Sequence, residues 1–392
     1  TDRPFLKRVN WIHATLLLST PLIALYGFCT TSMMWQTMVF SVVYYFMTGL
    51  GITAGYHRLF SHRAYKACFP VQVFLACMGS GAVQGSVRWW SRDHRAHHRY
   101  VDTPGDPYAV TEGFFYAHLG WLLMKQDPSR IGKAEIKDLN SSPFLRFQHR
   151  QYPWFALMFG FVVPTVVCGL LWGDWRGGYF YAAVGRLVFV HHSTFCINSV
   201  AHYWGDTTFS DKHTAKNSIV AAFLTLGEGS HNFHHEFEQD YRNGIFWWQY
   251  DPTKVVIRVM AALGLVWDLK RFPANEIKKG HLQMKQQALD KEKETVNWGP
   301  DPATLPEYTL EYVQSRVSTG KQKWVVLNGF VLDLAPFAGD HPGGEGIIRA
   351  MMGKDITKAF VGGVYTHSNA ATNLSTMFRI ARLAPPGAIK TD

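Results

Sequence analysis

A long uncharged run near the N-terminus sets the strongest limit on how this chain can fold. Residues 9–57 contain no Asp, Glu, Lys or Arg. Because a helix needs about 20 residues to cross a bilayer, this run predicts two membrane spans, at about residues 11–31 and 34–54. A second apolar pair predicts two more spans, at about 154–172 and 178–200. A signal peptide would have a shorter apolar core and a cleavage site, so spans in tandem are favoured.

The basic residues predict how these spans are oriented. The connectors within each pair carry almost no charge, whereas Arg3, Lys7, Arg8, the stretch 58–150 and the chain after residue 206 are rich in Lys and Arg. By the positive-inside rule, both termini and all the loops that contain histidine clusters are expected to face the cytosol. The net charge of +10 follows this membrane topology, and we therefore expect no nucleic-acid partner.

The remaining segments predict a cytosolic cap and a second domain. The apolar stretches 69–87 and 218–229 are short or interrupted, which favours interfacial or buried helices over spans. Residues 1–273 are thus predicted to form an all-α membrane domain with four transmembrane helices and a cytosolic helical cap. A charged, partly helical linker at 274–297 leads to a small α+β domain at 298–386. The sequence begins with Thr rather than Met, so a preceding N-terminal piece is expected.

Three clusters of histidine mark the candidate site. RDHRAHH and HNFHH share the spacing H-x-x-H-H, and HRLFSH adds two more imidazoles upstream. The residues are His57, His62, His94, His97, His98, His231, His234 and His235. On a helix, positions i, i+3 and i+4 lie on neighbouring parts of one face, and imidazole is a ligand that suits Fe, Zn, Cu and Ni. One cluster alone could be a solvated basic face, but three in one chain favour metal binding.

The number of histidines predicts two metal ions. His202 adds a ninth imidazole where the fourth predicted span emerges, and Asn198 shares its helical face. Nine histidines exceed what one ion can use, whereas two ions with five or six ligands each would use them all. Zinc normally takes four ligands, so a pair of iron ions that reacts with O2 is favoured, although the pattern alone does not decide the metal. In each H-x-x-H-H cluster the middle residue is rotated away from the other two, so it can reach a second ion.

These motifs resemble those of a known family. HRLFSH, RDHRAHH and EGSHNFHHEFEQDYRNG look like the three histidine boxes of the membrane acyl-CoA (stearoyl-CoA) Δ9 desaturases, and GITAGYHRLFSH and FCINSVAHYWG extend the similarity. The chain is most similar to the fungal type, which carries a fused C-terminal cytochrome b5. The resemblance implies a first iron held by His57, His62, His94, His98 and His234, and a second held by His97, His202, His231 and His235, with Asn198 acting through a water.

The resemblance also implies the reaction and the substrate. Desaturases of this kind use O2 to place a cis double bond between C9 and C10 of a long-chain saturated acyl-CoA, here C16–C18, at the cytosolic face of the endoplasmic reticulum membrane. The residues implied in substrate binding are Gln84 and Thr194 at a bend of the acyl tunnel, Phe195 where the family has Trp, Tyr45 and Gly49 at the far end, and Arg92, Asp93 and Lys125 near the CoA head group. Ordinary helix packing is the alternative for Tyr45 and Gly49.

Arg186 is a charged residue inside the fourth predicted span. An ionisable residue within a membrane is by default a candidate functional residue, which makes Arg186 a further candidate for substrate binding. The alternative is that it snorkels or pairs inside the bundle, and the sequence favours neither. The seven histidines outside these sets are expected to be structural: His13, His118, His149, His191, His192, His213 and His281.

The C-terminal domain carries two further histidines. His341 begins the motif HPGG, and His367 lies 26 residues later in HSNAA. Both motifs look like those of cytochrome b5, in which two imidazoles bind opposite faces of one haem b and make an electron carrier. Fusion raises the effective concentration of the electron donor at its acceptor. Because no G-x-G-x-x-G fingerprint follows a predicted strand, electrons are expected to come from NADH through a separate cytochrome b5 reductase.

Two alternatives remain beside the desaturase. A membrane fatty-acid or alkane hydroxylase uses similar histidine boxes but returns oxygen to carbon, so the product, alkene or alcohol, separates the two. An electron-transfer protein anchored by its membrane region would leave four spans and nine ordered histidines unexplained. We therefore predict an enzyme whose partners are long-chain saturated acyl-CoA, the reductase and membrane lipid.

Overall fold

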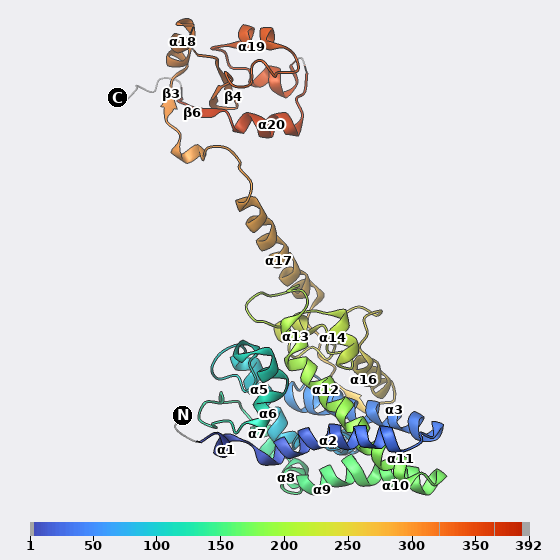
Figure 1. Ribbon diagram of the computed structural model, residues 1–392. Coiled ribbons are helices and arrows are strands. Elements are labelled where there is room, and N and C mark those ends of the chain that lie inside the picture. The colour runs from blue at the N-terminus through green and yellow to red at the C-terminus, as the bar shows by residue number, and fades with distance from the viewer. Residues whose placement is uncertain (1–3, 321, 364, 386–392) are drawn as a thin grey trace. The chain divides into compact units, whose positions relative to one another are not determined.

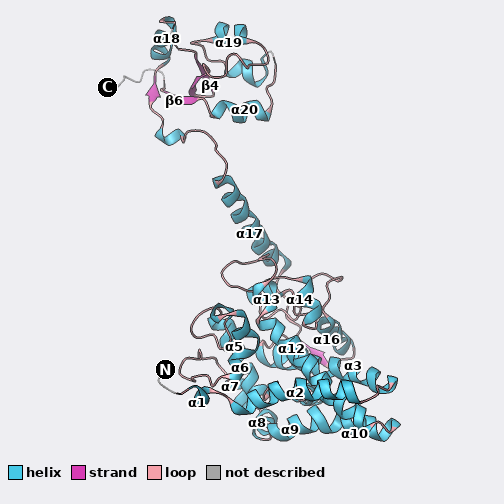
Figure 2. Ribbon diagram, in the orientation of Figure 1, coloured by secondary structure: helices cyan, strands magenta, loops and turns pink. Residues whose placement is uncertain are grey.

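The computed structural model describes residues 4–320, 322–363 and 365–385 (Figure 1). The chain forms two compact units, residues 1–287 and 288–392. The boundary falls inside α17 (Ala274–Glu294), so the stretch predicted as a partly helical linker is a single helix over most of its length. Most of the described chain is helical, and the larger sheet belongs to the second unit (Figure 2).

Three helices of the first unit are long and apolar enough to cross a membrane, within the part of the chain that is described. They are α2 (Trp11–Thr30), the continuous helix of α3 (Trp35–Leu50) and η1 (Gly51–Ser61), and the continuous helix of α9 (Tyr152–Leu157), η4 (Met158–Val162) and α10 (Val163–Trp172). They lie where the first three spans are predicted, and the second is longer than predicted because the helix continues past residue 54.

The fourth predicted span also forms a helix. It consists of η5 (Gly178–Gly185) and α12 (Arg186–Asn198) and contacts α2, α3 and α10, as Figure 1 also shows. It is not among the three apolar helices, because Arg186, His191 and His192 lower its mean hydropathy. A count of four spans therefore stays a prediction.

The second apolar helix widens into the π-helix η1 as it enters the cap. All of its side chains are buried. Gly51 lies so close to Gly79 that a Cβ on Gly51 would overlap the Gly79 backbone, so glycine is needed for this close approach. Irregular π turns frequently mark functional sites, and here η1 carries His57 into the interior of the cap.

The cap is built from short helices and a small sheet. Its elements are α4 (Phe69–Ser80), α5 (Val87–Tyr100), η2 (Val110–Glu112), η3 (Tyr116–Gly120), α6 (Trp121–Leu123), α7 (Lys137–Ser141), α8 (Pro143–Arg150), α13 (Val200–Tyr203), α14 (Ile219–Leu224), α15 (His231–Glu236) and α16 (Pro252–Ala262). Strand β1 (Lys66–Ala67) pairs antiparallel with β2 (Val266–Trp267). This pairing joins the beginning of the cap to its end. The remaining short helices of the unit are α1 (Phe5–Arg8) and α11 (Trp175–Gly177).

The core of the first unit lies where η1 meets the cap. Tyr56 of η1, Tyr65 and Tyr241 are almost fully buried, and Ile52 and Ile257 belong to the same apolar cluster. Tyr65 donates a hydrogen bond to the carbonyl of Ala54 at 2.8 Å, so its buried hydroxyl is satisfied. This packing fixes η1 against the cap and thereby positions the histidines at its end.

The second unit is a small α+β fold. Its four-stranded sheet has the order β3-β6-β5-β4, with β3 and β6 parallel and the other pairs antiparallel. The strands are β3 (Glu307–Tyr308), β4 (Trp324–Leu327), β5 (Phe330–Asp333) and β6 (Arg379–Leu383), and the helices are η6 (Pro302–Thr304), α18 (Leu310–Ser318), α19 (Glu345–Met351), η7 (Ala359–Gly363) and α20 (Asn369–Thr376). Val325, Leu332 and Ile348 form part of the core on one face of the sheet.

Candidate metal centre and cavity

The nine histidines of the predicted site come from four parts of the first unit. His57 lies in η1 and His62 directly after it, the RDHRAHH cluster lies in α5, His202 in α13, and the HNFHH cluster in α15. The α5 helix begins with Ser86 as its N-cap, whose side chain accepts a hydrogen bond from the Trp89 backbone. The face of α5 that carries His94 and His97 is buried. Both H-x-x-H-H motifs are helical, as their spacing predicts.

Five of these histidines form one cluster. They are His57, His62, His94, His98 and His234, and one ring nitrogen of each lies within 4.8 Å of the others. The Nε2 atoms of His57 and His234 are 2.9 Å apart, those of His62 and His94 are 2.9 Å apart, and those of His98 and His234 are 3.0 Å apart. Nε2 therefore points inward from every one of these rings.

The other four histidines form a second cluster. His97, His202, His231 and His235 also bring one nitrogen each to within 4.8 Å of the others. The Nε2 atoms of His202 and His231 are 3.0 Å apart, and those of His231 and His235 are 3.1 Å apart. The two clusters contain the same residues as the two ligand sets that the resemblance implies.

The Nδ1 atoms of several of these rings face protein acceptors, whereas that of His231 is buried without a hydrogen-bond partner among the described residues. His97 contacts Asp106 at 2.9 Å, and His57 and His98 face Glu228 and Glu238 at 3.4 Å. In the second cluster His202 contacts the hydroxyl of Thr214 at 2.8 Å. A hydrogen bond at Nδ1 selects the tautomer whose Nε2 lone pair is free and orients the ring. These outer partners thus prepare Nε2 for a metal ion.

The electrostatics of the site favour a bound cation. Burial, together with the neighbouring imidazoles, holds the pKa values of the α5 and α15 histidines His94, His98, His231, His234 and His235 well below the usual range. Burial would raise the pKa of Glu228, but Arg58 at 2.7 Å and His57 lower it to about 2. These five rings are therefore neutral near pH 7, and where their Nε2 lone pairs face one another they repel unless a positive ion lies between them. The residues present fit such an ion.

The separations between the Nε2 atoms agree with one ion in each cluster. Two nitrogens bound at about 2.1 Å and at right angles to each other lie about 3 Å apart, whereas a tetrahedral angle would place them about 3.4 Å apart. The five Nε2 separations given above run from 2.9 to 3.1 Å. They match ligands at right angles, which is the arrangement of an octahedral site.

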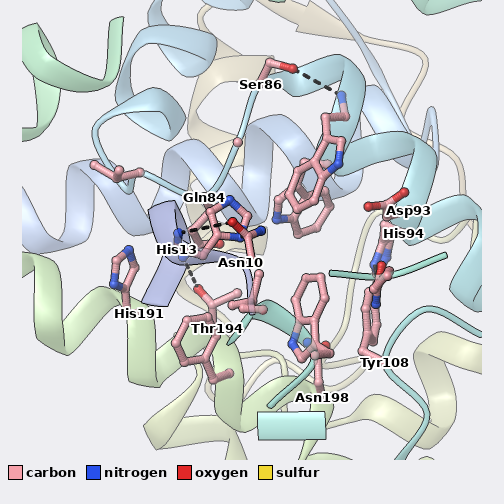
Figure 3. A pocket seen from close by; sticks show the side chains of 18 of the residues that line it. Asn10, His13, Gln84, Ser86, Asp93, His94, Tyr108, His191, Thr194 and Asn198 are labelled. Atoms are coloured by element: carbon pink, nitrogen blue, oxygen red, sulfur yellow. Dashed lines mark hydrogen bonds between the residues drawn. The ribbon is translucent and has the colours of Figure 1, made fainter. Parts of the chain in front are cut away.

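A cavity of about 710 Å³ opens beside the first cluster. Its wall includes His57 and His94 of the first cluster and Asn198. Most of the remaining wall is apolar or aromatic, with Trp89, Trp90 and Trp121 among its residues. Figure 3 shows Asp93, His94 and Tyr108 close together in this cavity, with Asn198 also exposed to it.

Six of the nine residues predicted to bind substrate line the cavity. They are Gln84, Arg92, Asp93, Lys125, Thr194 and Phe195. The Gln84 amide donates a hydrogen bond to the Thr194 hydroxyl at 2.9 Å, drawn as a dashed line in Figure 3. Arg92 pairs with Asp93 at 2.6 Å, and burial raises the pKa of the Asp93 carboxyl to about 6 although Arg92 lowers it.

The other three predicted substrate residues are not part of this wall. Tyr45 donates to the Ser193 hydroxyl at 3.1 Å, and Gly49 packs against the side chain of Leu226. Arg186 is buried and donates to the carbonyls of Gly81 and Gly160. The contacts of Tyr45 and Gly49 agree with ordinary packing, and those of Arg186 agree with a side chain held inside the bundle. A role in substrate binding stays a prediction for all three.

The structure also shows site residues that the sequence did not reveal. Asp106 lies in a loop among other carboxylates, and nothing in its local sequence marks it. Glu228 and Glu238 had one signal, because both lie within the motif EGSHNFHHEFEQDYRNG that contains the third histidine cluster. His13, His149 and His191 were expected to be structural, but all three line the cavity, because α2, α8 and α12 converge there from distant parts of the chain.

The second unit brings its two predicted haem ligands together. The rings of His341 and His367 have centroids 6.5 Å apart and are tilted by 33°. Two metal–nitrogen bonds of roughly 2 Å and half of each ring fill about this separation. The His367 ring contacts the carbonyl of Phe360 through Nδ1 at 3.1 Å and stacks on the Phe360 ring at 4.1 Å. The pair therefore fits one haem iron between the two rings.

Comparison with known proteins agrees with this geometry. The family model "Fatty acid desaturase" matches residues 33–268, and the model "Cytochrome b5-like Heme/Steroid binding domain" matches residues 309–384. The probable acyl-CoA desaturase of Schizosaccharomyces pombe is 51% identical over 96% of this chain and 78% of its own length. Acyl-CoA desaturase 1 of Saccharomyces cerevisiae is 43% identical over 96% of this chain and 74% of its own.

A human relative and a solved structure extend the comparison. Stearoyl-CoA desaturase of Homo sapiens is 38% identical over 67% of this chain and 74% of its own length. Cytochrome b558 of Ectothiorhodospira vacuolata is 34% identical and is covered over 100% of its chain, but it covers 20% of this one with a TM-score of 0.19, which is too low to support an argument about the fold. The predicted resemblance is confirmed by the family models and the fungal relatives: the chain belongs to the fatty acid desaturase family and carries a cytochrome b5-like domain over residues 309–384.

Proposed function

We propose that this oxidoreductase is an acyl-CoA Δ9 desaturase that places a cis double bond between C9 and C10 of a saturated C16–C18 acyl-CoA. The observation that carries the proposal is the cavity of about 710 Å³ whose mostly apolar wall includes His57 and His94 of the first histidine cluster. A cavity of this kind takes an apolar chain with a few polar contacts. The names of the relatives, acyl-CoA desaturase and stearoyl-CoA desaturase, support this substrate.

We propose that the clusters hold two iron ions. His57, His62, His94, His98 and His234 would hold one, and His97, His202, His231 and His235 the other, with Asn198 contributing through a water. The Nε2 separations near 3 Å support octahedral sites over tetrahedral zinc. When bound, such an iron pair supplies the redox chemistry by which O2 is reduced to water while two hydrogens leave the acyl chain.

The protein's own residues would bind and position the substrate. The apolar wall excludes water from the acyl chain, which limits side reactions. Gln84 and Thr194 hold each other by a hydrogen bond in the wall, and in the family's arrangement such a pair lies where the chain bends. Arg92 and Lys125 line the cavity and are basic groups for the phosphates of CoA. Holding the chain in one register against His57 and His94 selects the bond that reacts.

Electrons would enter through haem. We propose that His341 and His367 bind the iron of haem b, and that a separate reductase transfers electrons from NADH to it. A haem with two imidazole ligands has no open site for O2, which suits electron transfer rather than oxygen chemistry. The three apolar helices support a membrane location, and we propose the endoplasmic reticulum with both termini in the cytosol and membrane lipid around the helices.

The test combines metal analysis with lipid analysis. The full chain would be expressed in cells that make no cis-Δ9 alkenes, purified, and analysed for iron, zinc and haem, while the cellular fatty acids are analysed by gas chromatography. We expect two irons in addition to the haem iron and new cis-Δ9 fatty acids. His234→Ala should abolish the alkene, whereas His281→Ala, a histidine of α17 outside both clusters, should not.

The same experiment separates the alternatives. Hydroxy fatty acids instead of alkenes would identify a hydroxylase, for which no feature of the site gives separate support. Zinc in both clusters and unchanged lipids would contradict redox chemistry at the histidines. If the purified protein held haem but no metal at the histidine clusters, the electron-transfer protein would be the one remaining alternative.

A further inference from the structure

The turn between α4 and α5 has a strained backbone. Val83 has φ of +52°, which is a genuine outlier for a β-branched residue. Val83 and Gln84 both line the cavity. A strained conformation of this kind persists only where the surrounding structure holds it, and such positions concentrate at functional sites. The contacts of the turn, residues 81–85, therefore show what holds it.

Two residues of α12 bind the carbonyls that precede Val83. Arg186 donates to the Gly81 carbonyl at 2.7 Å, and the His191 ring lies 2.9 Å from the Ala82 carbonyl through Nε2. Arg186 also donates to the Gly160 carbonyl of η4 at 2.8 Å. One buried guanidinium thus links the turn to the third apolar helix.

Arg186 has no carboxylate partner among the residues that the structure describes. Arg186 is 3% exposed, and its guanidinium carbon lies 5.1 Å from the centre of the Tyr44 ring. A buried cation within a membrane bundle is costly and rarely kept without a use. Here its hydrogen bonds go to backbone carbonyls, and one of them belongs to the strained turn.

The residues that follow Val83 are held as well. Gln84 donates to Thr194 of α12 at 2.9 Å, and the Gly85 amide donates to the Tyr152 hydroxyl at 2.8 Å. The turn is therefore held on both sides of Val83, by α12 and by the helix that begins at Tyr152. Several hydrogen bonds together fix its position along the cavity.

We propose that Arg186 is a positioning residue that fixes which carbon–carbon bond of the acyl chain is oxidised. This inference rests on the proposed desaturase function. His57 and Val83 line the same cavity. The distance between the histidine clusters and the turn therefore sets how far the acyl chain can extend past the histidines. If the turn relaxes, the acyl chain can shift along the cavity. Carbon–carbon bonds next to C9–C10 then reach the position where hydrogen is removed. Arg186 prevents this by holding the turn in its strained form.

The first test is the positional-isomer ratio of the product. Arg186→Met removes the donors and keeps the apolar stem, and we expect a several-fold rise in the ratio of other positional isomers to the Δ9 product, read by mass spectrometry of derivatised fatty acids. The matched control is Arg176→Met, because Arg176 is exposed and donates to the hydroxyl of Thr31 at the other end of the helix pair. It should leave the ratio unchanged. A fall in total product with an unchanged ratio for Arg186→Met would show a purely structural role and overturn the proposal.

The second test removes the strain that Arg186 is proposed to hold. Glycine adopts positive φ without steric cost. In a Val83→Gly background the turn therefore no longer needs the hydrogen bonds of Arg186 to keep its conformation. We expect Arg186→Met to change the isomer ratio less in this background than in the wild type, which is a coupling that a double-mutant cycle measures. Equal effects in the two backgrounds would contradict the mechanism.

A third variant covers the case in which Arg186→Met does not accumulate in membranes. Arg186→Lys keeps the charge but loses the planar fork that reaches two carbonyls at once, and we expect an intermediate isomer ratio; an unchanged ratio would overturn the proposal. Failure of the proposed function is recognised separately, because a wild-type product that is an alcohol refutes desaturation, while the position of its hydroxyl group along the chain still reports on Arg186.

Discussion

Asp106 accepts a hydrogen bond from Nδ1 of His97 at 2.9 Å, and both side chains are buried. The same carboxylate accepts from the backbone amides of Asp102 and Tyr108, so its own position is fixed by the loop that follows α5. This carboxylate therefore sets the tautomer and the direction of one ring of the second cluster.

Asp106→Asn should weaken the metal affinity of the second cluster. Loss of an outer carboxylate partner typically costs 10–100-fold in metal affinity, so we expect about this loss in chelator competition followed by metal analysis. The first cluster should keep its metal. Asp268→Asn is the matched control, because Asp268 forms an exposed ion pair with Lys66 and such pairs contribute little. Equal metal retention in both variants would show that Asp106 does not support the site.

Gly51→Ala should destabilise the junction between the second apolar helix and the cap. The added methyl would overlap the backbone of Gly79, and overpacking of this kind costs about 1–3 kcal/mol. We expect a lower midpoint of thermal unfolding and reduced metal content, because His57 lies in the same π-helix. Gly120→Ala has only an ordinary contact of 3.4 Å with the Phe115 carbonyl and should leave both measurements unchanged.

Removal of the metal should lower the stability of the first unit and spare the second. A bound ligand stabilises the folded state by mass action, and the neutral rings whose Nε2 atoms lie near 3 Å apart repel one another without a cation. We expect chelator treatment to lower the temperature at which the helical cap unfolds. Hydrogen exchange of residues 87–100 measures this unfolding. The second unit, monitored by the absorption of its haem, should unfold at its original temperature. A cap that unfolds at the same temperature with and without metal would contradict this electrostatic picture.

His341→Ala and His367→Ala should each remove the spectrum of a haem with two imidazole ligands. The two rings lie 6.5 Å apart, so neither substitution leaves a second protein ligand in place. We expect loss of the low-spin absorption bands and a lower ratio of haem to protein in purified chain. Unchanged spectra for either variant would assign the haem to other residues. Phe360→Leu is the control: it should weaken haem binding less, because the backbone carbonyl of residue 360 still contacts His367.

The sequence predicts the parts of this molecule that depend on local spacing. The H-x-x-H-H repeats anticipated helices α5 and α15 and the different direction of the middle histidine, since both follow from 3.6 residues per turn. The first three apolar helices follow from the absence of charge over a sufficient length. These features need no knowledge of how distant segments pack.

Features that depend on packing between distant segments could not be predicted. Asp106 contacts His97 in the folded chain, but nothing in its neighbourhood in the sequence separates it from other carboxylates. The π-helix η1 depends on the close approach of Gly51 to Gly79, which a helical pattern does not show. Arg186 had two readings from the sequence, and only the carbonyls of Gly81 and Gly160 at 2.7 and 2.8 Å favour a structural contact over one with substrate.

The placement of α15 has a consequence for how the protein is made. A nascent chain that ends before residue 231 lacks His234 of the first cluster and both His231 and His235 of the second. Neither cluster is complete until this helix has left the ribosome and brought His234 to His98 of α5, by which time the apolar helices have already been synthesised. If the two clusters hold the proposed ions, metal loading is therefore a late event in biogenesis, and a truncated chain from an interrupted message would be inserted in the membrane without either complete site.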